Sequence, residues 1–473
     1  MQLHETNGAK MYYIRSPEII YRKEPNGGTV FNRRTTIARE INLTAARIFE
    51  CCDGDKTVND IAKVICEEFE NVDFPIALRD TKNVLEKMFE HKLIVKSEDK
   101  VEPEISYYEK YKGVQVSGIR RPLWADIEFT LKCNLKCVHC SANAGFAKEK
   151  ELTTAECKKM LDDIQEAGII GVTFTGGEAL MRDDVFELAE YAKKIGLAPV
   201  LFSNGFFIDN SNAKKIKELF SIVQISIDGS TPEMHDKFRG VPTSWKRATN
   251  AVRMLAELGH IVMVSSVMTS ADMPEMRKRV ELAISLGAPI IRLGFAQPMG
   301  RGAGIVSELT PDQTRSFVAA VLELSKEYQQ KIAVDIDEPL EDLFNLERWD
   351  KKVAPRKMCG AAIHRIAIDP EGNVKPCILL GGWPEFTGGN VRERTVWDII
   401  ENSEIFKLFR SMSVDQFERC GICTFKYACG GSCRAIVYLY NKDRYPEKDR
   451  FKALYATPPH CFEFKEIENV IAT

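Results

Sequence analysis

The stretch Phe129-Thr-Leu-Lys-Cys133-Asn-Leu-Lys-Cys137-Val-His-Cys140 decides how the rest of the chain is interpreted. Its three cysteines have the spacing C-x3-C-x2-C and follow an apolar run that begins at Ile127, which predicts a loop at the end of a strand. A [4Fe–4S] cluster takes four thiolates, one per iron, so three cysteines in one loop would leave one iron open to an outside ligand. Zinc sites more often use paired cysteines or cysteine and histidine pairs. The spacing therefore favours an iron–sulfur site over zinc or over unligated core thiols.

This loop resembles the signature of the radical S-adenosylmethionine (SAM) superfamily. In that family the open iron binds the amino and carboxylate groups of SAM. The resemblance implies that Cys133, Cys137 and Cys140 form the catalytic cluster site. It also places His139 where the family usually has an aromatic residue against the adenine of SAM.

Size and composition set limits on the function. A chain of 473 residues suggests about two to four domains, and 44% hydrophobic with 28% charged residues is typical of a globular protein. A net charge of −3 gives no reason to expect a nucleic-acid partner. There is no long apolar window and no signal peptide, which predicts a cytoplasmic protein without a membrane partner. Fourteen cysteines in such a chain indicate metal or redox chemistry rather than disulfides.

Residues 1–97 form the first predicted domain. Short strand patterns precede three helical stretches at residues 44–52, 57–69 and 77–89, and Thr57 with Asp60 has the pattern of a helix N-cap. This layout predicts a winged-helix-like fold, which would be compatible with nucleic-acid binding. The acidic end of the second helix argues against that use, because it would repel phosphate.

The same domain resembles the peptide-recognition domain of ribosomal peptide maturation systems, the fold of the pyrroloquinoline quinone peptide chaperone (PqqD). The pattern that carries the resemblance is Asn42-Leu-Thr…Ile48…Cys52-Asp-Gly…Val58-x2-Ile61, and a generic winged helix is the alternative. The resemblance implies that a leader peptide binds as an added strand at the edge of the small sheet. Three cysteines inside the predicted helices are expected to be small buried apolar residues: Cys51, Cys52 and Cys66.

After a predicted linker at residues 98–123, strand and helix patterns alternate over residues 124–331. This alternation predicts an α/β fold with a parallel sheet, whose strand ends carry the chemistry. The family resemblance implies an open partial (β/α)6 barrel, similar to a TIM barrel. The predicted strands are 127–130, 171–175, 199–203, 222–227, 261–268 and 290–295. The predicted helices include 153–167, 185–194, 245–258 and 274–286, the last of which would open on Pro274.

Further candidate residues follow the other predicted strands. By resemblance, Gly176, Gly177 and Glu178 contact the amino group of SAM, because glycines allow close approach and a carboxylate can pair with an ammonium group. Ser226 and Arg239 are implied to hold its ribose and carboxylate. The alternative is that these are turn residues and a surface salt bridge. The other candidates are Ser203, Asp228 and a flexible glycine-rich loop that begins at Pro298.

Residues 332–473 contain seven cysteines in the order C-x12-G-x4-C, gap, C-x2-C-x5-C-x3-C, gap, C. This order resembles the SPASM domain of radical SAM maturases, with zinc as an alternative. The resemblance implies one auxiliary [4Fe–4S] cluster on Cys420, Cys423, Cys429 and Cys461. It implies a second on Cys359, Cys377 and Cys433. The second cluster lacks a fourth cysteine, which predicts another open iron unless a different ligand or Cys157 closes it. Cys157 is otherwise expected to be a core residue.

Together these features predict a radical SAM/SPASM enzyme with three [4Fe–4S] clusters and SAM. It would install a crosslink, a cysteine thioether by preference, in a ribosomally synthesised precursor peptide. An external reductant such as a flavodoxin or a ferredoxin would supply electrons. The alternatives within enzymes are carbon–carbon crosslinking and epimerisation of a peptide. From another class, the alternatives are a multi-cluster electron carrier and a zinc-stabilised peptide-binding module.

Overall fold

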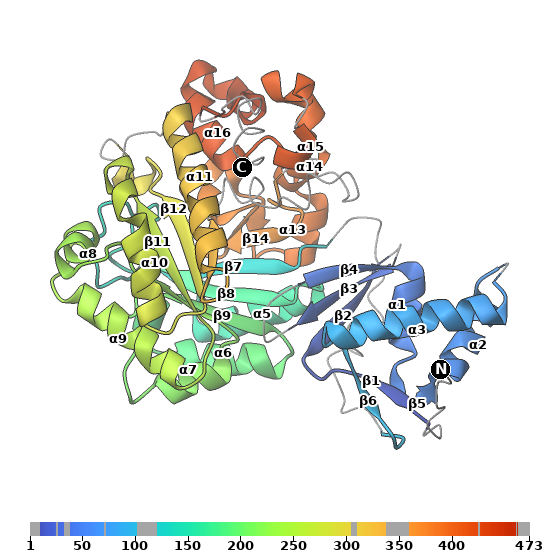
Figure 1. Cartoon of the computed structure of the whole chain (residues 1–473). Helices are drawn as coiled ribbons and strands as arrows, with labels where there is room; N and C mark the ends of the chain where they lie inside the picture. The colour runs from blue at the N-terminus through green and yellow to red at the C-terminus, as the bar shows by residue number, and fades with distance from the viewer. Residues whose placement is uncertain are drawn as a thin grey trace. The chain divides into compact units, whose positions relative to one another are not determined.

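The computed structural model of the chain describes residues 10–24, 27–32, 38–70, 72–101, 121–303, 310–336, 359–423, 426–459 and 461. The chain divides into two compact units, Met1–Arg121 and Pro122–Thr473 (Figure 1). Most of the linker predicted at residues 98–123 lies outside the described residues. In the described ranges, no helix is long and apolar enough to cross a membrane.

Within its described residues, the first unit contains two antiparallel three-stranded sheets, with strand orders β2-β3-β4 and β5-β1-β6, and three helices. Each helix begins at a side-chain cap, and Thr57 and Asp60 form the reciprocal capping box that the sequence predicts for α2. The elements are β1 (Tyr12–Arg15), β2 (Ile19–Glu24), β3 (Gly27–Asn32), β4 (Ala38–Asn42), α1 (Leu43–Glu50), β5 (Asp53–Thr57), α2 (Val58–Glu68), α3 (Phe74–Glu90) and β6 (Ile94–Ser97).

Helices and sheets of this unit share a core that includes Tyr21, Ile48 and Phe49. Cys51 and Cys52 are buried in it, as predicted, but they follow α1 rather than lie inside it. The reason is that the chain leaves α1 after Glu50 and enters β5, where the sequence predicted only a turn between helices. Cys66 is only half-buried, because it faces a surface pocket at the end of α2.

The second unit is built on one ten-stranded sheet with the order β13-β12-β11-β10-β9-β8-β7-β14-β15-β16. Strands β7 to β13 run parallel, and β14 also pairs in parallel with β7, whereas β15 and β16 are antiparallel. The strands are β7 (Trp124–Thr130), β8 (Gly171–Gly176), β9 (Ala198–Ser203), β10 (Val223–Ser226), β11 (Val262–Met268), β12 (Ile290–Phe295), β13 (Ala333–Ile336), β14 (Arg365–Ile368), β15 (Asn373–Lys375) and β16 (Gly389–Asn390). All six predicted strands are present, and β13 and β14 extend the sheet at both ends.

Helices follow the parallel strands and lie outside the curved sheet in Figure 1. They are α5 (Thr154–Glu166), α6 (Val185–Lys194), α7 (Ala213–Leu219), α8 (Pro232–Arg239), α9 (Ser244–Glu257), α10 (Met276–Ser285) and α11 (Pro311–Tyr328). The helix predicted to open on Pro274 begins at Met276 instead. Pro274 lies in the preceding 3-10 turn, which Thr269 and Asp272 cap. Short helices complete the cysteine-rich end: α13 (Val396–Asn402), α14 (Glu404–Ser411), α15 (Lys426–Cys429) and α16 (Arg434–Asn441).

The two faces of β7 serve different purposes. Ala125, Ile127 and Phe129 pack with the helices in the main core, and the ring of Phe129 stacks on Phe174 of β8 at 4.3 Å between centroids. Because side chains alternate along a strand, Asp126 and Glu128 point into the interior of the partial barrel. The interior face of β7 therefore presents polar groups, and the cysteine loop follows at the end of this strand.

Candidate functional site

The loop after β7 carries Cys133, Cys137 and Cys140, and neighbouring segments hold its shape. The backbone N–H of Cys133 donates to the carbonyl of Gly145 (3.0 Å), and two further N–H groups of the loop donate to carbonyls at the end of α8. The sulfurs accept donors in turn: Leu135 N–H lies 3.5 Å from Cys133 Sγ, and Ala144 N–H lies 3.4 Å from Cys140 Sγ. Donors aimed at sulfur are a feature of cluster-binding loops, so these residues fit an iron–sulfur group.

Burial, with added repulsion from Glu178 and the other two cysteines, raises the pKa of Cys133 to about 11. A thiolate at this position therefore needs a compensating cation. Among the described residues there is no group of three His, Cys, Asp or Glu side chains close enough to hold a single metal ion. A zinc ion would gather thiolates at about 2.3 Å, whereas a four-iron cluster spreads its thiolates around its larger core. Three cysteines in one loop match the three thiolates of a cluster with one open iron.

Arg301, in the loop after β12, packs directly against the cysteine loop. Its Nε donates to the carbonyl of Cys137 (2.9 Å), its Nη1 donates to the carbonyl of Ala144, and its backbone N–H donates to Cys140 (3.0 Å). The sequence predicted a flexible loop here, but its described part, up to Ala303, is fixed by these bonds. No motif pointed to Arg301 itself; the only signal was an arginine between the glycines of a loop at a strand end.

Gly176 and Gly177 lie at the end of β8, where their missing side chains allow close approach to the cysteine loop. A Cβ at Gly176 would lie 2.2 Å from the carbonyl oxygen of Thr130, and a Cβ at Gly177 would lie 2.4 Å from that of Lys132. Gly176 also has a φ of +128°, which disfavours other residues. The two glycines therefore allow the loop that carries Cys133 to pack closely against the end of β8. The sequence analysis instead explained these glycines by the close approach of a ligand.

Glu178 is 1% exposed, and its carboxylate is largely satisfied inside the protein. It accepts hydrogen bonds from Ser203 Oγ (2.9 Å), the N–H of Asn204 (2.7 Å) and the N–H of Leu180 (3.1 Å). A carboxylate offers about four acceptor positions, so capacity remains for roughly one more donor. The structure thus brings the predicted residues Glu178 and Ser203 into direct contact.

Asp228, just past the end of β10, lies at the centre of a buried charged cluster. Arg239 Nε is 2.5 Å from its Oδ2, His139 Nε2 is 3.7 Å away, and the N–H of Val267 donates to its Oδ1 (2.9 Å). Burial alone would raise the pKa of Asp228, but Arg239 and then His139 outweigh that effect and hold it at about 2. Asp228 and Arg239, for which a surface salt bridge was the alternative, therefore form a buried ion pair. Removal of either partner would leave an uncompensated buried charge.

Arg239 also connects this cluster to the cysteine loop, since its Nη1 lies 3.7 Å from Cys137 Sγ. Burial lowers the pKa of His139 to about 4, so its imidazole is neutral at physiological pH. The His139 ring stacks on Phe238 with 4.2 Å between centroids and an angle of 11°. Ser226, at the end of β10, is half-buried. Three predicted residues, His139, Asp228 and Arg239, thus meet in one buried cluster. Ser226 lies two residues before Asp228, at the end of β10.

Glu128 was missed by the sequence analysis. It faces the barrel interior opposite Thr175 of β8, and its carboxylate makes no hydrogen bond or ion pair within the part of the chain that the structure describes. Burial, and next Asp369, raises its pKa to about 7, whereas Lys375 at the end of β15 opposes the shift. The alternation Trp124, Asp126, Glu128 along β7 was the signal that could have revealed it.

Three of the remaining cysteines, Cys420, Cys429 and Cys433, lie in or next to α15 and α16. Cys420 lies in the turn Arg419–Ile422, Cys429 ends α15, and Cys433 is the N-cap of α16. Burial, and next the thiols of Cys420 and Cys461, raises the pKa of Cys429 to about 11. Burial and then Cys423 raise the pKa of Cys420. The four cysteines predicted for one auxiliary cluster are therefore electrostatic neighbours.

Cys377 lies two residues after the end of β15 and directly before the turn Ile378–Leu380. Cys377 and Cys433 are buried, and Cys359 is half-buried against the main core. Cys157 lies elsewhere, in α5, where its Sγ donates to the carbonyl of Leu152 (3.7 Å). It is 1% exposed and belongs to the core, which confirms its expected burial.

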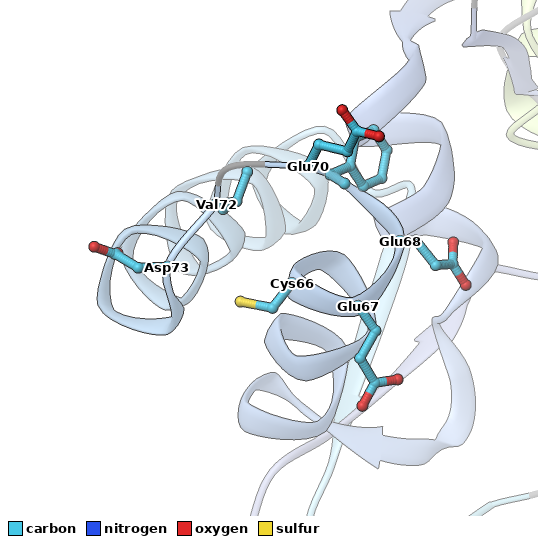
Figure 2. Close-up of a pocket in the computed structure, with 7 residues that line it drawn as sticks. Cys66, Glu67, Glu68, Glu70, Val72 and Asp73 are labelled. Carbon is cyan, nitrogen blue, oxygen red and sulfur yellow. The ribbon is translucent and has the colours of Figure 1, made fainter.

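The first unit has its own surface features. A pocket of about 560 Å³ lies at the end of α2, and Figure 2 shows the thiol of Cys66 directed into the space near the start of α3. The carboxylates of Glu67, Glu68 and Glu70 point in different directions around it. This acidic surface repels phosphate, which agrees with the argument against nucleic-acid binding.

Comparison with known proteins finds three family matches along the chain. The chain matches the Radical SAM superfamily over residues 127–284, the coenzyme PQQ synthesis protein D (PqqD) family over residues 28–94 and the iron–sulfur cluster-binding SPASM domain over residues 359–424. It is 30% identical to the AdoMet-dependent heme synthase of Methanosarcina barkeri, over 68% of this chain and 93% of that protein. It is 26% identical to the antilisterial bacteriocin subtilosin biosynthesis protein AlbA of Bacillus subtilis, over 83% and 84% of the two chains.

Among solved structures, SuiB of Streptococcus suis covers 95% of this chain and 100% of its own, with a TM-score of 0.67 and 15% identity. The chain therefore belongs to the radical SAM superfamily. It is an enzyme of that superfamily with a PqqD domain before the barrel and a SPASM domain after it, and iron–sulfur clusters and SAM are its cofactors.

Proposed function

We propose that this enzyme installs a cysteine thioether in a ribosomally synthesised precursor peptide. The observation that carries the proposal is the presence of a PqqD domain together with both cysteine-rich regions in one chain. AlbA, whose name assigns it to the biosynthesis of a bacteriocin, matches over 83% of this chain. SuiB, which has the same fold, has also been solved with its precursor peptide SuiA.

A second candidate is chemistry on a tetrapyrrole, because the heme synthase of Methanosarcina barkeri is a relative at 30% identity. That match spans 68% of this chain, less than the AlbA match, and a tetrapyrrole enzyme has no evident use for a peptide-recognition domain. Carbon–carbon crosslinking or epimerisation of a peptide stays as the alternative within peptide chemistry. These reactions differ in their products, so one product analysis separates them.

In the proposed site, Cys133, Cys137 and Cys140 hold the cluster that binds SAM. When bound and reduced there, the cluster and SAM would supply a 5′-deoxyadenosyl radical for the removal of one hydrogen atom from the peptide. The second hydrogen would leave as the proton of the peptide thiol, and an auxiliary cluster would accept the remaining electron. Arg301 and Arg239 fix the loop from two sides, and the buried pair of Arg239 with Asp228 keeps the guanidinium in place. The remaining proposed SAM contacts are His139, Gly176, Gly177, Glu178, Ser203 and Ser226.

We assign Cys420, Cys423, Cys429 and Cys461 to one auxiliary cluster and Cys359, Cys377 and Cys433 to another, which makes three [4Fe–4S] clusters with the first. Seven cysteines serve two clusters that together take eight thiolates, so the second set has room for one more ligand. A cysteine of the substrate peptide suits that position, because thiolate is a strong ligand for iron. A flavodoxin or a ferredoxin is the proposed electron donor.

The leader of the peptide is proposed to bind to the first unit by strand addition. Strand β4 is at the edge of the β2-β3-β4 sheet, and its residues from Ala38 to Glu40 are exposed. Leader peptides methylated at single backbone nitrogens test this, because only every second amide of an added strand faces its neighbour. Binding to the full chain should weaken at alternate positions only. Equal binding of every methylated peptide would exclude strand addition.

The proposed reaction itself is tested with short cysteine-containing peptides encoded beside the gene. The reconstituted enzyme, SAM and reductant should convert such a peptide into a product that has lost two hydrogens and resists thiol alkylation. A peptide epimerised without loss of mass, or a modified tetrapyrrole, would select one of the alternatives.

A further inference from the structure

Arg434, the residue after Cys433, is completely buried at the start of α16. Its Nη1 donates to the carbonyls of Leu454 (3.0 Å) and Ala456 (3.3 Å), and its Nε donates to the carbonyl of Ser432 (3.3 Å). Its Nη2 is buried and has no hydrogen-bond partner among the residues that the structure describes. No carboxylate pairs with this guanidinium anywhere in the described ranges.

An arginine in this state is costly, because a buried charge without a counter-ion loses its solvation by water. The three carbonyls and the ring of Phe417, 4.1 Å from the guanidinium carbon, offset only part of that cost. Arginine cannot escape the cost by losing its proton. The arrangement therefore fits an anionic group beside Nη2.

The groups around Arg434 show where that anion would be. Its charge interacts with the thiols of Cys359, Cys420, Cys433 and Cys429. Two of these belong to each proposed auxiliary set. The contacts of its guanidinium also reach the segments next to Cys420, through Phe417, and before Cys461, through Ala456. A [4Fe–4S] core ligated by thiolates carries a net negative charge. The positive charge and the Nη2 N–H donors of the Arg434 guanidinium therefore fit the clusters of a SPASM domain.

We propose that Arg434 is the counter-cation shared by the two auxiliary cluster sites and that its Nη2 serves them as a hydrogen-bond donor. The inference rests on the proposed division of the cysteines into two sets, but not on the nature of the peptide product. Reduction adds negative charge to a cluster, and a nearby fixed cation in a low-dielectric interior stabilises the reduced form. Arg434 should therefore raise the reduction potentials of both auxiliary clusters.

The test compares Arg434→Met and Arg434→Lys with Arg410→Met in the full chain. Cys133, Cys137 and Cys140 are replaced by alanine in all variants, so that only auxiliary clusters contribute. Arg410 is a matched control in the same unit, because its guanidinium donates to the carbonyls of Ile400 and Glu401. Iron and sulfide are quantified after anaerobic reconstitution, and a potentiometric titration is followed by electron paramagnetic resonance.

Arg434→Met should disfavour reduction of both clusters at least tenfold, which is a negative shift of about 59 mV for a one-electron couple. Arg434→Lys keeps the charge and should shift less, and Arg410→Met should not shift. Loss of auxiliary iron in Arg434→Met alone would also support the proposal, because it shows that assembly needs the charge. Unchanged potentials with full iron content would overturn it. Equal loss of iron in Arg434→Met and Arg434→Lys would overturn it as well, since packing rather than charge would then explain the residue.

Discussion

Replacing Glu128 by glutamine should stabilise the second unit above about pH 4.5, with the full effect above about pH 7. Glu128 faces the barrel interior, and its carboxylate has no hydrogen-bond or ion-pair partner in the described parts of the chain. Burial and the carboxylate of Asp369 are the main causes that raise its pKa from 4.5 to about 7. The folded protein therefore binds this proton more tightly than the unfolded chain does.

The sign follows from that difference. Below pH 4.5 the carboxyl is protonated in both states and costs nothing, whereas above about pH 7 the folded protein holds an unfavourable buried charge. The increase in pKa corresponds to at most about 3 kcal/mol at about 1.36 kcal/mol per pKa unit. Wild-type stability should fall by up to this amount as the pH rises through the window, and Glu128→Gln should not show this loss.

Urea unfolding of the metal-free full chain, followed by tryptophan fluorescence, measures the effect. All five tryptophans follow residue 121, so the signal reports the second unit. Glu156→Gln is a control of opposite sign, because Arg392 holds the pKa of Glu156 at about 2 and its replacement should destabilise the protein above pH 4.5. If Glu128→Gln is no more stable than wild type at alkaline pH, the barrel interior around Glu128 solvates the charge and the reasoning fails.

Three further results are expected. Reconstituted enzyme should contain roughly twelve iron atoms per chain. Joint replacement of Cys133, Cys137 and Cys140 by alanine should remove about a third of this iron and abolish SAM cleavage. Stoichiometric zinc without iron would contradict the cluster assignment. Arg301→Ala removes two charged hydrogen bonds to the cysteine loop, each of about 1.5–3 kcal/mol. It should lose the first cluster at least tenfold faster under a chelator than wild type, while the exposed control Arg277→Ala should not. Substrate peptide should perturb the spectrum of the cluster on Cys359, Cys377 and Cys433, and a peptide with its cysteine changed to serine should do so far less; equal perturbation by both would exclude thiolate ligation.

The sequence predicted the barrel well, because buried parallel strands and amphipathic helices leave strong periodic patterns. Strand β12 has the predicted bounds Ile290–Phe295, and α6 has the predicted bounds Val185–Lys194. Patterns failed where tertiary context decides. Residues Asp53–Thr57 have turn chemistry but form β5, because β1 lies beside them and supplies the hydrogen bonds.

The sequence predicted which residues belong to the candidate site, because motifs mark them, but it did not predict which of these residues contact one another. Cys133 and Glu178 were both named from the sequence, but nothing in it showed that Glu178 is bound by Ser203 and Asn204. Arg301 and Arg434 were missed for a related reason. Their importance comes from carbonyls and thiols of segments far away in the chain, which no local pattern encodes.

The central claim is that the enzyme links a peptide cysteine to a carbon atom, and mass spectrometry of the product tests it most directly. Enzyme, SAM, reductant and a cysteine-containing precursor peptide are incubated together, and a peptide with serine in place of that cysteine is incubated in parallel. The account predicts that the first peptide loses two hydrogens, that fragmentation locates the bond at the cysteine sulfur and that 5′-deoxyadenosine forms alongside. It also predicts no such product from the serine peptide. Loss of two hydrogens from both peptides, or SAM cleavage that leaves the cysteine peptide unchanged, would contradict it.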